Sequence, residues 1–128
     1  MPITPVKDLV AKAKSEITTL SIVDAKAAHD DPETLFIDIR DIRELARDGR
    51  IPGAMHAPRG MLEFWVDPAS PYHKPEFASG KRLVLFCASS WRSALATKTL
   101  QDMGLENVCE LDGGFNGWRD AGLAVEVD

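Results

Sequence analysis

The stretch LVLFCASSWRSALATKTLQDMG, residues 83–104, indicates a strand, a tight loop and a helix in direct succession. Its first part is a short run of consecutive apolar residues, which is typical of a parallel strand buried on both faces. Its last part has apolar residues at helical spacing, and Gly104 stands where helices commonly end. The residues at that spacing are Leu95, Ala96, Leu100 and Met103. Cys87 ends the strand, so the chain presents a thiol where strand and helix meet.

The rest of the chain alternates between short helices and short strands in the same way. We expect helices at 5–16 after an N-cap at Thr4, at 22–28 after an N-cap at Ser21, at 41–47 before Gly49, at 61–66 and at 115–122. We expect strands at 17–20, 34–39, 54–56, 82–86 and 107–111, and a proline-rich surface loop at 67–80. This order predicts one three-layer α/β/α domain over 1–128, with a mainly parallel central sheet of about five strands. The N-terminal helix lies within 1–16 and the core covers about 20–122.

The amino-acid composition limits the classes of protein to which this chain can belong. A chain of 128 residues with 45% hydrophobic and 27% charged residues has the size and balance of one globular domain. The net charge of −5 argues against nucleic acid and anionic membranes as partners, but not against a small anionic substrate. The two cysteines form no Cys-x-x-Cys pair and have no zinc-ligand spacing, so we expect no disulfide framework and no metal. With no signal-peptide pattern and no run of about 18 apolar residues, we expect a cytoplasmic protein.

The loop after Cys87 has the composition of an anion site. Ligands of parallel sheets bind at the carboxyl ends of the strands, where Cys87 stands. Backbone N–H groups at a helix N-terminus favour the thiolate, which is the nucleophilic form of cysteine. We therefore expect the amides of Ala88, Ser89, Ser90, Trp91 and Ser93 to surround the sulfur, and Arg92 to bind an anionic ligand. The alternative interpretation is a buried cysteine that only fills the core.

Four segments of the chain resemble the rhodanese family of sulfurtransferases. They are FIDIRDIREL, GRIPGAMHAP, LFCASSWRSALA and LDGGFNGW, which follow one another in the family's order between about Leu20 and Gly122. The resemblance implies that Cys87 takes the outer sulfur of a donor such as thiosulfate, holds it as a persulfide, and passes it to cyanide or a thiol. It implies no cofactor, and a sulfur-accepting protein is a further candidate partner. Arg92 would assist Cys87 in catalysis.

Two positions depart from the family pattern. Arg50 stands where histidine is usual, in a segment that shapes a turn, and we expect little effect on function. Ser90 stands where close relatives often have glycine. If that position requires a positive φ, serine is strained there, because only glycine adopts such a backbone without cost.

The other candidate residues have competing interpretations. Asp38, Arg40 and Glu44 either position substrate or form a structural ion-pair network, which we favour; Arg59 either reaches the donor or is solvated. Trp91 is expected to point outward. For Phe64 and Trp65 we favour the core over a lid, and for His56 and His73 a non-catalytic role. We favour packing in a core strand over a resolving thiol for Cys109, and expect Gly113, Gly114 and Trp118 to form a tight turn and anchor a helix.

Two functions from other classes remain open. Protein-tyrosine-type phosphatases also combine a strand-end cysteine, a loop of amides and an arginine, but with five residues between cysteine and arginine. This chain has four, from Ala88 to Trp91. The second alternative is a non-catalytic rhodanese-like binding module; such modules typically lack the cysteine.

Overall fold

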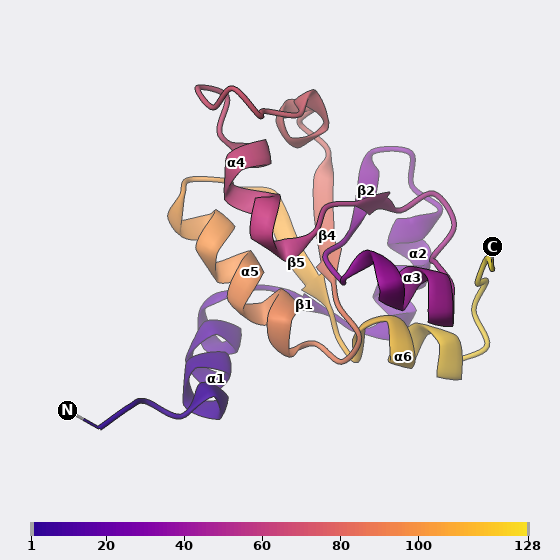
Figure 1. The fold of residues 1–128 in the computed structure, drawn as a ribbon. Coiled ribbons are helices and arrows are strands. Elements are labelled where there is room, and N and C mark those ends of the chain that lie inside the picture. The colour runs from indigo at the N-terminus through magenta and orange to yellow at the C-terminus, as the bar shows by residue number, and fades with distance from the viewer. Residues whose placement is uncertain (1, 128) are drawn as a thin grey trace.

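The computed structural model describes residues 2–127, which form a sheet of five parallel strands between layers of helices (Figure 1). The strands are β1 (Thr19–Leu20), β2 (Thr34–Asp38), β3 (Met55–His56), β4 (Arg82–Phe86) and β5 (Val108–Leu111), in the spatial order β1-β5-β4-β2-β3. The helices are α1 (Val6–Glu16), α2 (Ile22–His29), α3 (Ile42–Asp48), α4 (Leu62–Val66), α5 (Trp91–Asp102) and α6 (Gly114–Asp120), with 3₁₀ turns η1 (Arg59–Met61) and η2 (Pro75–Ala78). The predicted three-layer α/β/α architecture with a parallel sheet is confirmed. Residues 1 and 128 of the expected domain lie outside the described part.

Strand β4 lies at the centre of the sheet and is buried on both faces. Leu83 and Leu85 point into a core shared with α4 and α5, whereas Val84 and Phe86 point into a second core shared with α2 and α6. Figure 1 shows α4 and α5 on one side of the sheet and α2 and α6 on the other. Burial on both faces explains the continuous apolar run of β4, because a strand with one face in water would alternate apolar and polar residues.

The N-terminal helix packs on α5 rather than on the sheet. Val10 and Ala13 of α1 form a small apolar cluster with Ala94 of α5. The predicted N-cap at Thr4 is wrong by one residue: Pro5 is the N-cap, and its carbonyl accepts the N–H groups of Asp8 and Leu9. This packing brings the Lys14 side chain of α1 to Ser90, the residue before α5, and Glu16 to Lys98 within α5.

Several boundaries differ from the prediction for local reasons. Ile17 caps the end of α1, so β1 begins only at Thr19. Ser21 caps α2 as predicted, since its hydroxyl accepts the N–H of Asp24. Met103 was expected to pack with α5, but it follows the last helical residue and 46% of it is exposed.

The segment between α4 and β4 is more ordered than a plain surface loop. It contains η2, whose Phe77 is buried in the core. The expected core position of Phe64 is wrong: the residue is 52% exposed and its ring meets that of Tyr72 edge-on at 6.4 Å. Trp65 packs partly against the core, with the Lys74 ammonium over its ring. Phe64 and Tyr72 therefore form a small aromatic pair on the surface.

Candidate active site

Cys87 lies directly after β4, at the N-terminus of α5, and is only 1% exposed. Its Sγ accepts the backbone N–H of Ser90 at 3.2 Å and that of Ser93 at 3.4 Å. Its thiol also lies 3.5 Å from the Ser93 hydroxyl, to which it can donate. Since backbone N–H groups favour negative charge on an acceptor, the loop suits sulfur in its anionic form.

The chain turns through Ser90 in a left-handed conformation, with φ of +85°. Ser90 is the one non-glycine residue with positive φ within residues 2–127, which confirms the strain expected at this position. It is also the N-cap residue of α5, yet its side chain makes no capping hydrogen bond to the helix. The N–H of Ser93, which an N-cap side chain commonly binds, is instead bound by the cysteine sulfur.

The first turn of α6 supports the cysteine loop. Phe115 and Asn116 donate their N–H groups to the carbonyls of Cys87 and Ala88, at 2.8 and 3.0 Å. Gly114 has φ of +58°, and a Cβ there would lie 2.8 Å from the carbonyl carbon and oxygen of Ala88. Only glycine lets the two backbones approach this closely. The Gly113-Gly114 pair thus has the structural role predicted for it, and its effect is to hold the cysteine loop.

Arg92 forms an ion pair with Glu44 of α3, at 3.1 Å between Nη1 and Oε2. Burial lowers the pKa of the Arg92 guanidinium, but Glu44, and then Cys87, outweigh it and raise the pKa above its ordinary value. The guanidinium side chain stays 43% exposed, so its outer face can meet a ligand from solvent.

Asp38 and Arg40 form a buried ion pair at the carboxyl end of β2, with 2.7 Å between Nη2 and Oδ2. Arg40 also donates to the Gly49 carbonyl at 2.8 Å, and its guanidinium lies 4.1 Å from the centre of the Phe115 ring. His56 contacts the Arg40 carbonyl at 2.7 Å. These contacts confirm the structural interpretation of Asp38 and Arg40. The expected network does not include Glu44, which binds Arg92 instead.

Arg59 begins η1 at the carboxyl end of the parallel strands, where Cys87 also lies. Its N–H donates to the Ile39 carbonyl at 3.3 Å, and the Ile39 N–H donates to Phe86, the residue before Cys87. The Arg59 side chain is bound by Glu63 at 2.7 Å and is 35% exposed. Burial raises the pKa of Glu63, but the hydrogen bond from Arg59 outweighs it, and the pKa lies below its ordinary value. Arg59 thus lies near the carboxyl end of the sheet, but its side chain is already bound to Glu63.

Of the remaining candidate residues, some lie at the exposed side of the cysteine loop and one lies in the core. Ser89 is exposed, Ala88 is half-buried, and Trp91 is 50% exposed, so its ring points outward as expected. Cys109 lies on the opposite face of the sheet from Cys87 and is buried, and burial raises its pKa to about 11. A thiol held protonated in the core fits the structural role predicted for Cys109.

Sequence reasoning missed a group of polar residues beneath the loop. Glu110 of β5 is fully buried, and its carboxylate accepts the hydroxyls of Ser90, Ser93 and Thr19. Lys14 of α1 lies 3.4 Å from the same carboxylate. A glutamate inside an otherwise apolar strand, VCEL, was the one available signal in the sequence.

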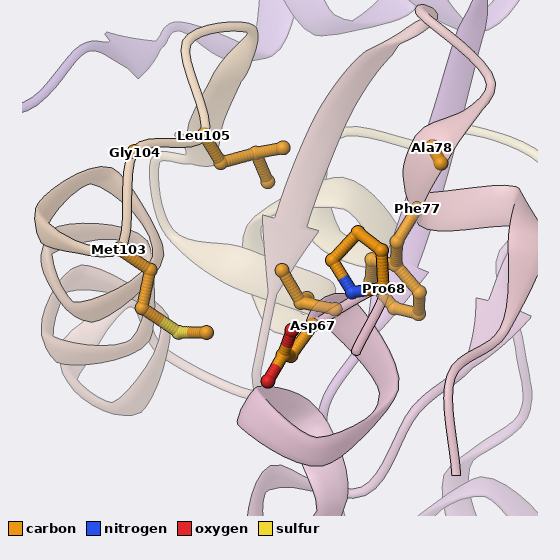
Figure 2. A pocket seen from close by; sticks show the side chains of 8 residues that line it. Asp67, Pro68, Phe77, Ala78, Met103, Gly104 and Leu105 are labelled. Atoms are coloured by element: carbon orange, nitrogen blue, oxygen red, sulfur yellow. The ribbon is translucent and has the colours of Figure 1, made fainter. Parts of the chain in front are cut away.

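A separate cavity lies away from the cysteine loop. It measures about 530 Å³ and is lined by residues of α4, η2 and the segment after α5, none of them from the cysteine loop. Figure 2 shows Met103 and Leu105 on one side of it and Pro68 and Phe77 on the other. Within residues 2–127, no cluster of three or more His, Cys, Asp or Glu side chains could hold a metal ion, and no helix is long and apolar enough to cross a membrane.

Comparison with known proteins agrees with this arrangement. A protein of unknown function from Rhodopseudomonas palustris, described as a possible tyrosine phosphatase, superposes with a TM-score of 0.92 at 50% identity, over 98% of this chain and 99% of that one. A sulfurtransferase from Allochromatium vinosum is 30% identical over 75% of this chain and 81% of its own length. An uncharacterised protein from Synechocystis is 34% identical over 70% of this chain, and the match spans 45% of that longer protein.

The family itself follows from a match that covers most of the chain. The sequence model of the rhodanese-like domain matches residues 21–121, from the N-cap of α2 to the end of α6. This range contains the whole cysteine loop and the glycine turn that supports it. The chain belongs to the rhodanese-like domain family.

Proposed function

We propose that this protein is a sulfurtransferase that carries a sulfane sulfur on Cys87. The observation that carries the proposal is the pair of N–H groups, from Ser90 and Ser93, directed at a buried strand-end sulfur. The same donors stabilise a thiolate before the reaction and a persulfide anion after it. The sulfurtransferase from Allochromatium vinosum supports this chemistry.

The reaction has two displacement steps. The Cys87 thiolate attacks the outer sulfur of a donor such as thiosulfate; a new S–S bond forms, the S–S bond of the donor breaks, and its electron pair leaves with sulfite. An acceptor, either cyanide or a thiolate, then attacks the outer sulfur of the persulfide. The persulfide bond breaks, and its electron pair returns to Cys87 as the thiolate.

The residues around Cys87 would bind the donor and hold the transferred sulfur. Arg92 would bind the anionic end of the donor with its exposed face and assist catalysis while Glu44 holds the guanidinium in place. Ala88, Ser89 and Trp91 would line the opening through which the donor enters, and Ser90 and Ser93 would hold the sulfur. Arg59 would reach the donor only by exchanging its bond to Glu63.

Donor, acceptor and location are part of the proposal. Thiosulfate is the donor we favour, and the acceptor is cyanide, a cellular thiol or a sulfur-accepting protein. Both cysteines are free. A nucleophilic cysteine that must stay reduced suits a reducing compartment, and we place the reaction in the cytoplasm.

Steady-state kinetics test the proposal. With thiosulfate and cyanide varied together, a persulfide intermediate predicts parallel double-reciprocal lines for thiocyanate formation, because sulfite leaves before cyanide reacts. Intersecting lines, or turnover that persists in Cys87→Ser, would contradict a sulfur carried on Cys87.

A cysteine phosphatase is the second candidate, favoured by the resemblance to the Rhodopseudomonas palustris protein. The loop argues against it, because four residues between Cys87 and Arg92 leave less room than the five of phosphatases. A phosphoryl group needs donors for three equatorial oxygens beside the attacking sulfur, and a misplacement of about 1 Å can lower the rate about 100-fold. Hydrolysis of an aryl phosphate that depends on Cys87 and rivals sulfur transfer would favour the phosphatase.

A further inference from the structure

Glu110 has no role in the two displacement steps, yet it is one of the most deeply buried charged residues of the protein. It lies on β5 opposite Leu85, with none of its surface exposed. A buried carboxylate is unfavourable unless hydrogen bonds and a counter-charge compensate it. Here the compensation comes from the beginning of α5 and from α1, so the position of Glu110 is tied to the cysteine loop.

The hydroxyls that Glu110 binds belong to the two residues that hold the sulfur. Its Oε1 accepts the Ser90 hydroxyl at 2.8 Å and the Ser93 hydroxyl at 2.6 Å. The backbone N–H groups of the same two serines point at Cys87 Sγ. One carboxylate oxygen thus fixes both residues whose amides receive the charge on sulfur.

The Ser90 hydroxyl does not cap the first turn of α5. A serine at an N-cap ordinarily turns its hydroxyl toward the N–H of the third helical residue, which here is Ser93. Ser90 is left-handed rather than extended as in such caps, and its hydroxyl donates to Glu110 and accepts from Lys14 at 2.9 Å. The Ser93 N–H is then left for Cys87. The same contacts hold Ser90 in a backbone conformation that serine alone disfavours.

Two of the supporting residues lie before the segment that matches the family. Lys14 supplies the positive charge and Thr19 donates to Oε2 at 2.9 Å, while the family match begins at residue 21. The N-terminal helix, through Lys14, and β1, through Thr19, therefore both contribute to the base of the cysteine loop.

We propose that Glu110 is a positioning residue, which holds Ser90 and Ser93 so that their amides serve the Cys87 sulfur, with Lys14 balancing its charge. As a role in the sulfur site, this rests on the proposed function. The charged groups that face this part of the molecule are Arg92 with Glu44, Arg59 with Glu63, and Glu110 with Lys14. Variants at Ser90 keep all of these charged side chains and remove only the hydroxyl that Glu110 and Lys14 bind.

The first experiment compares Ser90→Ala with Ser90→Gly in the full chain. The readout is the pH of half-maximal alkylation of Cys87 by a small reagent, with the label located by mass spectrometry. Alanine loses the hydroxyl bond to Glu110 but keeps the strain of the positive φ, so the backbone turns and the N–H at position 90 no longer points at Cys87 Sγ. The pH midpoint then rises by about one unit, the equivalent of a tenfold loss of thiolate. Glycine keeps the positive φ without strain, and its midpoint stays within about 0.3 units of the native value.

A change that only loosened the loop would alter the maximal alkylation rate without moving the midpoint. Equal midpoints in the native protein and Ser90→Ala would overturn the proposal. Equal rises in both variants would overturn it too, because the hydroxyl would then act on the sulfur itself.

The second experiment separates the acceptor role of Glu110 from its charge. Glu110→Gln and Glu110→Met are both neutral and similar in length, but only glutamine can accept the two serine hydroxyls. We expect the midpoint of the methionine variant about one unit above that of the glutamine variant. Glu106→Gln, at an exposed position before β5, is the control and should match the native protein.

Equal midpoints in the two Glu110 variants would refute the positioning role. If Glu110→Met does not fold, the comparison of Ser90→Ala with Ser90→Gly tests that role on its own. Alkylation requires no sulfur transfer. If the variants order as expected but thiosulfate gives no persulfide, the positioning role stands and the proposed function fails.

Discussion

Replacement of Gly114 by alanine should destabilise the protein much more than the same replacement at Gly113. Both glycines have positive φ, +58° and +73°, so alanine at either position costs about 1–2 kcal/mol of backbone strain. At Gly113 the new Cβ meets nothing nearer than the Cα of Gly117, at 3.4 Å, which is an ordinary contact. At Gly114 it would lie 2.8 Å from the Ala88 carbonyl and would also contact the Cys87 carbonyl oxygen.

The clash at Gly114 is with backbone, which cannot rotate away as a side chain can. Overpacking of this kind adds about 1–3 kcal/mol. We therefore expect Gly113→Ala to lower the free energy of unfolding by about 1–2 kcal/mol and Gly114→Ala by about 2–5 kcal/mol. Because Phe115 and Asn116 bind the loop carbonyls, the clash should also displace Cys87.

Urea unfolding of the two variants measures the difference, and sulfur transfer from thiosulfate measures the displacement. Gly113→Ala should keep most of its sulfur-transfer rate, while Gly114→Ala should lose about 100-fold if the sulfur moves by about 1 Å. Equal losses of stability in the two variants would refute the close-approach reasoning, since the strain from positive φ is common to both.

Three further predictions concern the cysteines and Arg92. Cys87→Ser should abolish thiocyanate formation and Cys109→Ser should keep most of it; equal losses would make Cys109 part of the chemistry. Arg92→Ala should raise KM for thiosulfate at low salt yet leave Cys87 open to alkylation, and an unchanged KM would mean that this side chain does not meet the donor. Burial raises the pKa of Cys109 from 9.0 to about 11. As the pH rises, the unfolded chain therefore releases this proton at a lower pH than the folded protein does. The free energy of unfolding should fall by about 2 kcal/mol between pH 9 and pH 11. In urea titrations across this range Cys109→Ala should lose less stability than the native protein, and parallel losses would count against the burial of the thiol.

Local patterns predicted the parts of the fold that depend on neighbouring residues. The apolar run of β4 reflects its central place in the sheet, and Ser21 caps α2 through a bond three residues away. The glycine that relatives often have in place of Ser90 raised the condition of a positive φ there, and the structure meets it. The start of α1 was missed because Pro5 takes the capping position itself.

The parts that could not be predicted depend on residues far apart in the chain. Lys14 and Ser90 are 76 positions apart, and Glu44 and Arg92 are 48 apart. No spacing rule links such pairs, because only the packing of α1 and α3 near the start of α5 brings them together. Glu44 was therefore assigned to the Asp38–Arg40 pair, which is its neighbour in sequence but not its partner.

The mass of the intact protein after treatment with thiosulfate tests the central claim most directly. We expect a gain of one sulfur atom, located on Cys87 by peptide mapping, absent from Cys87→Ser, and lost again when cyanide is added. A protein whose mass does not change with thiosulfate, or one that gains the sulfur equally in Cys87→Ser, would contradict it.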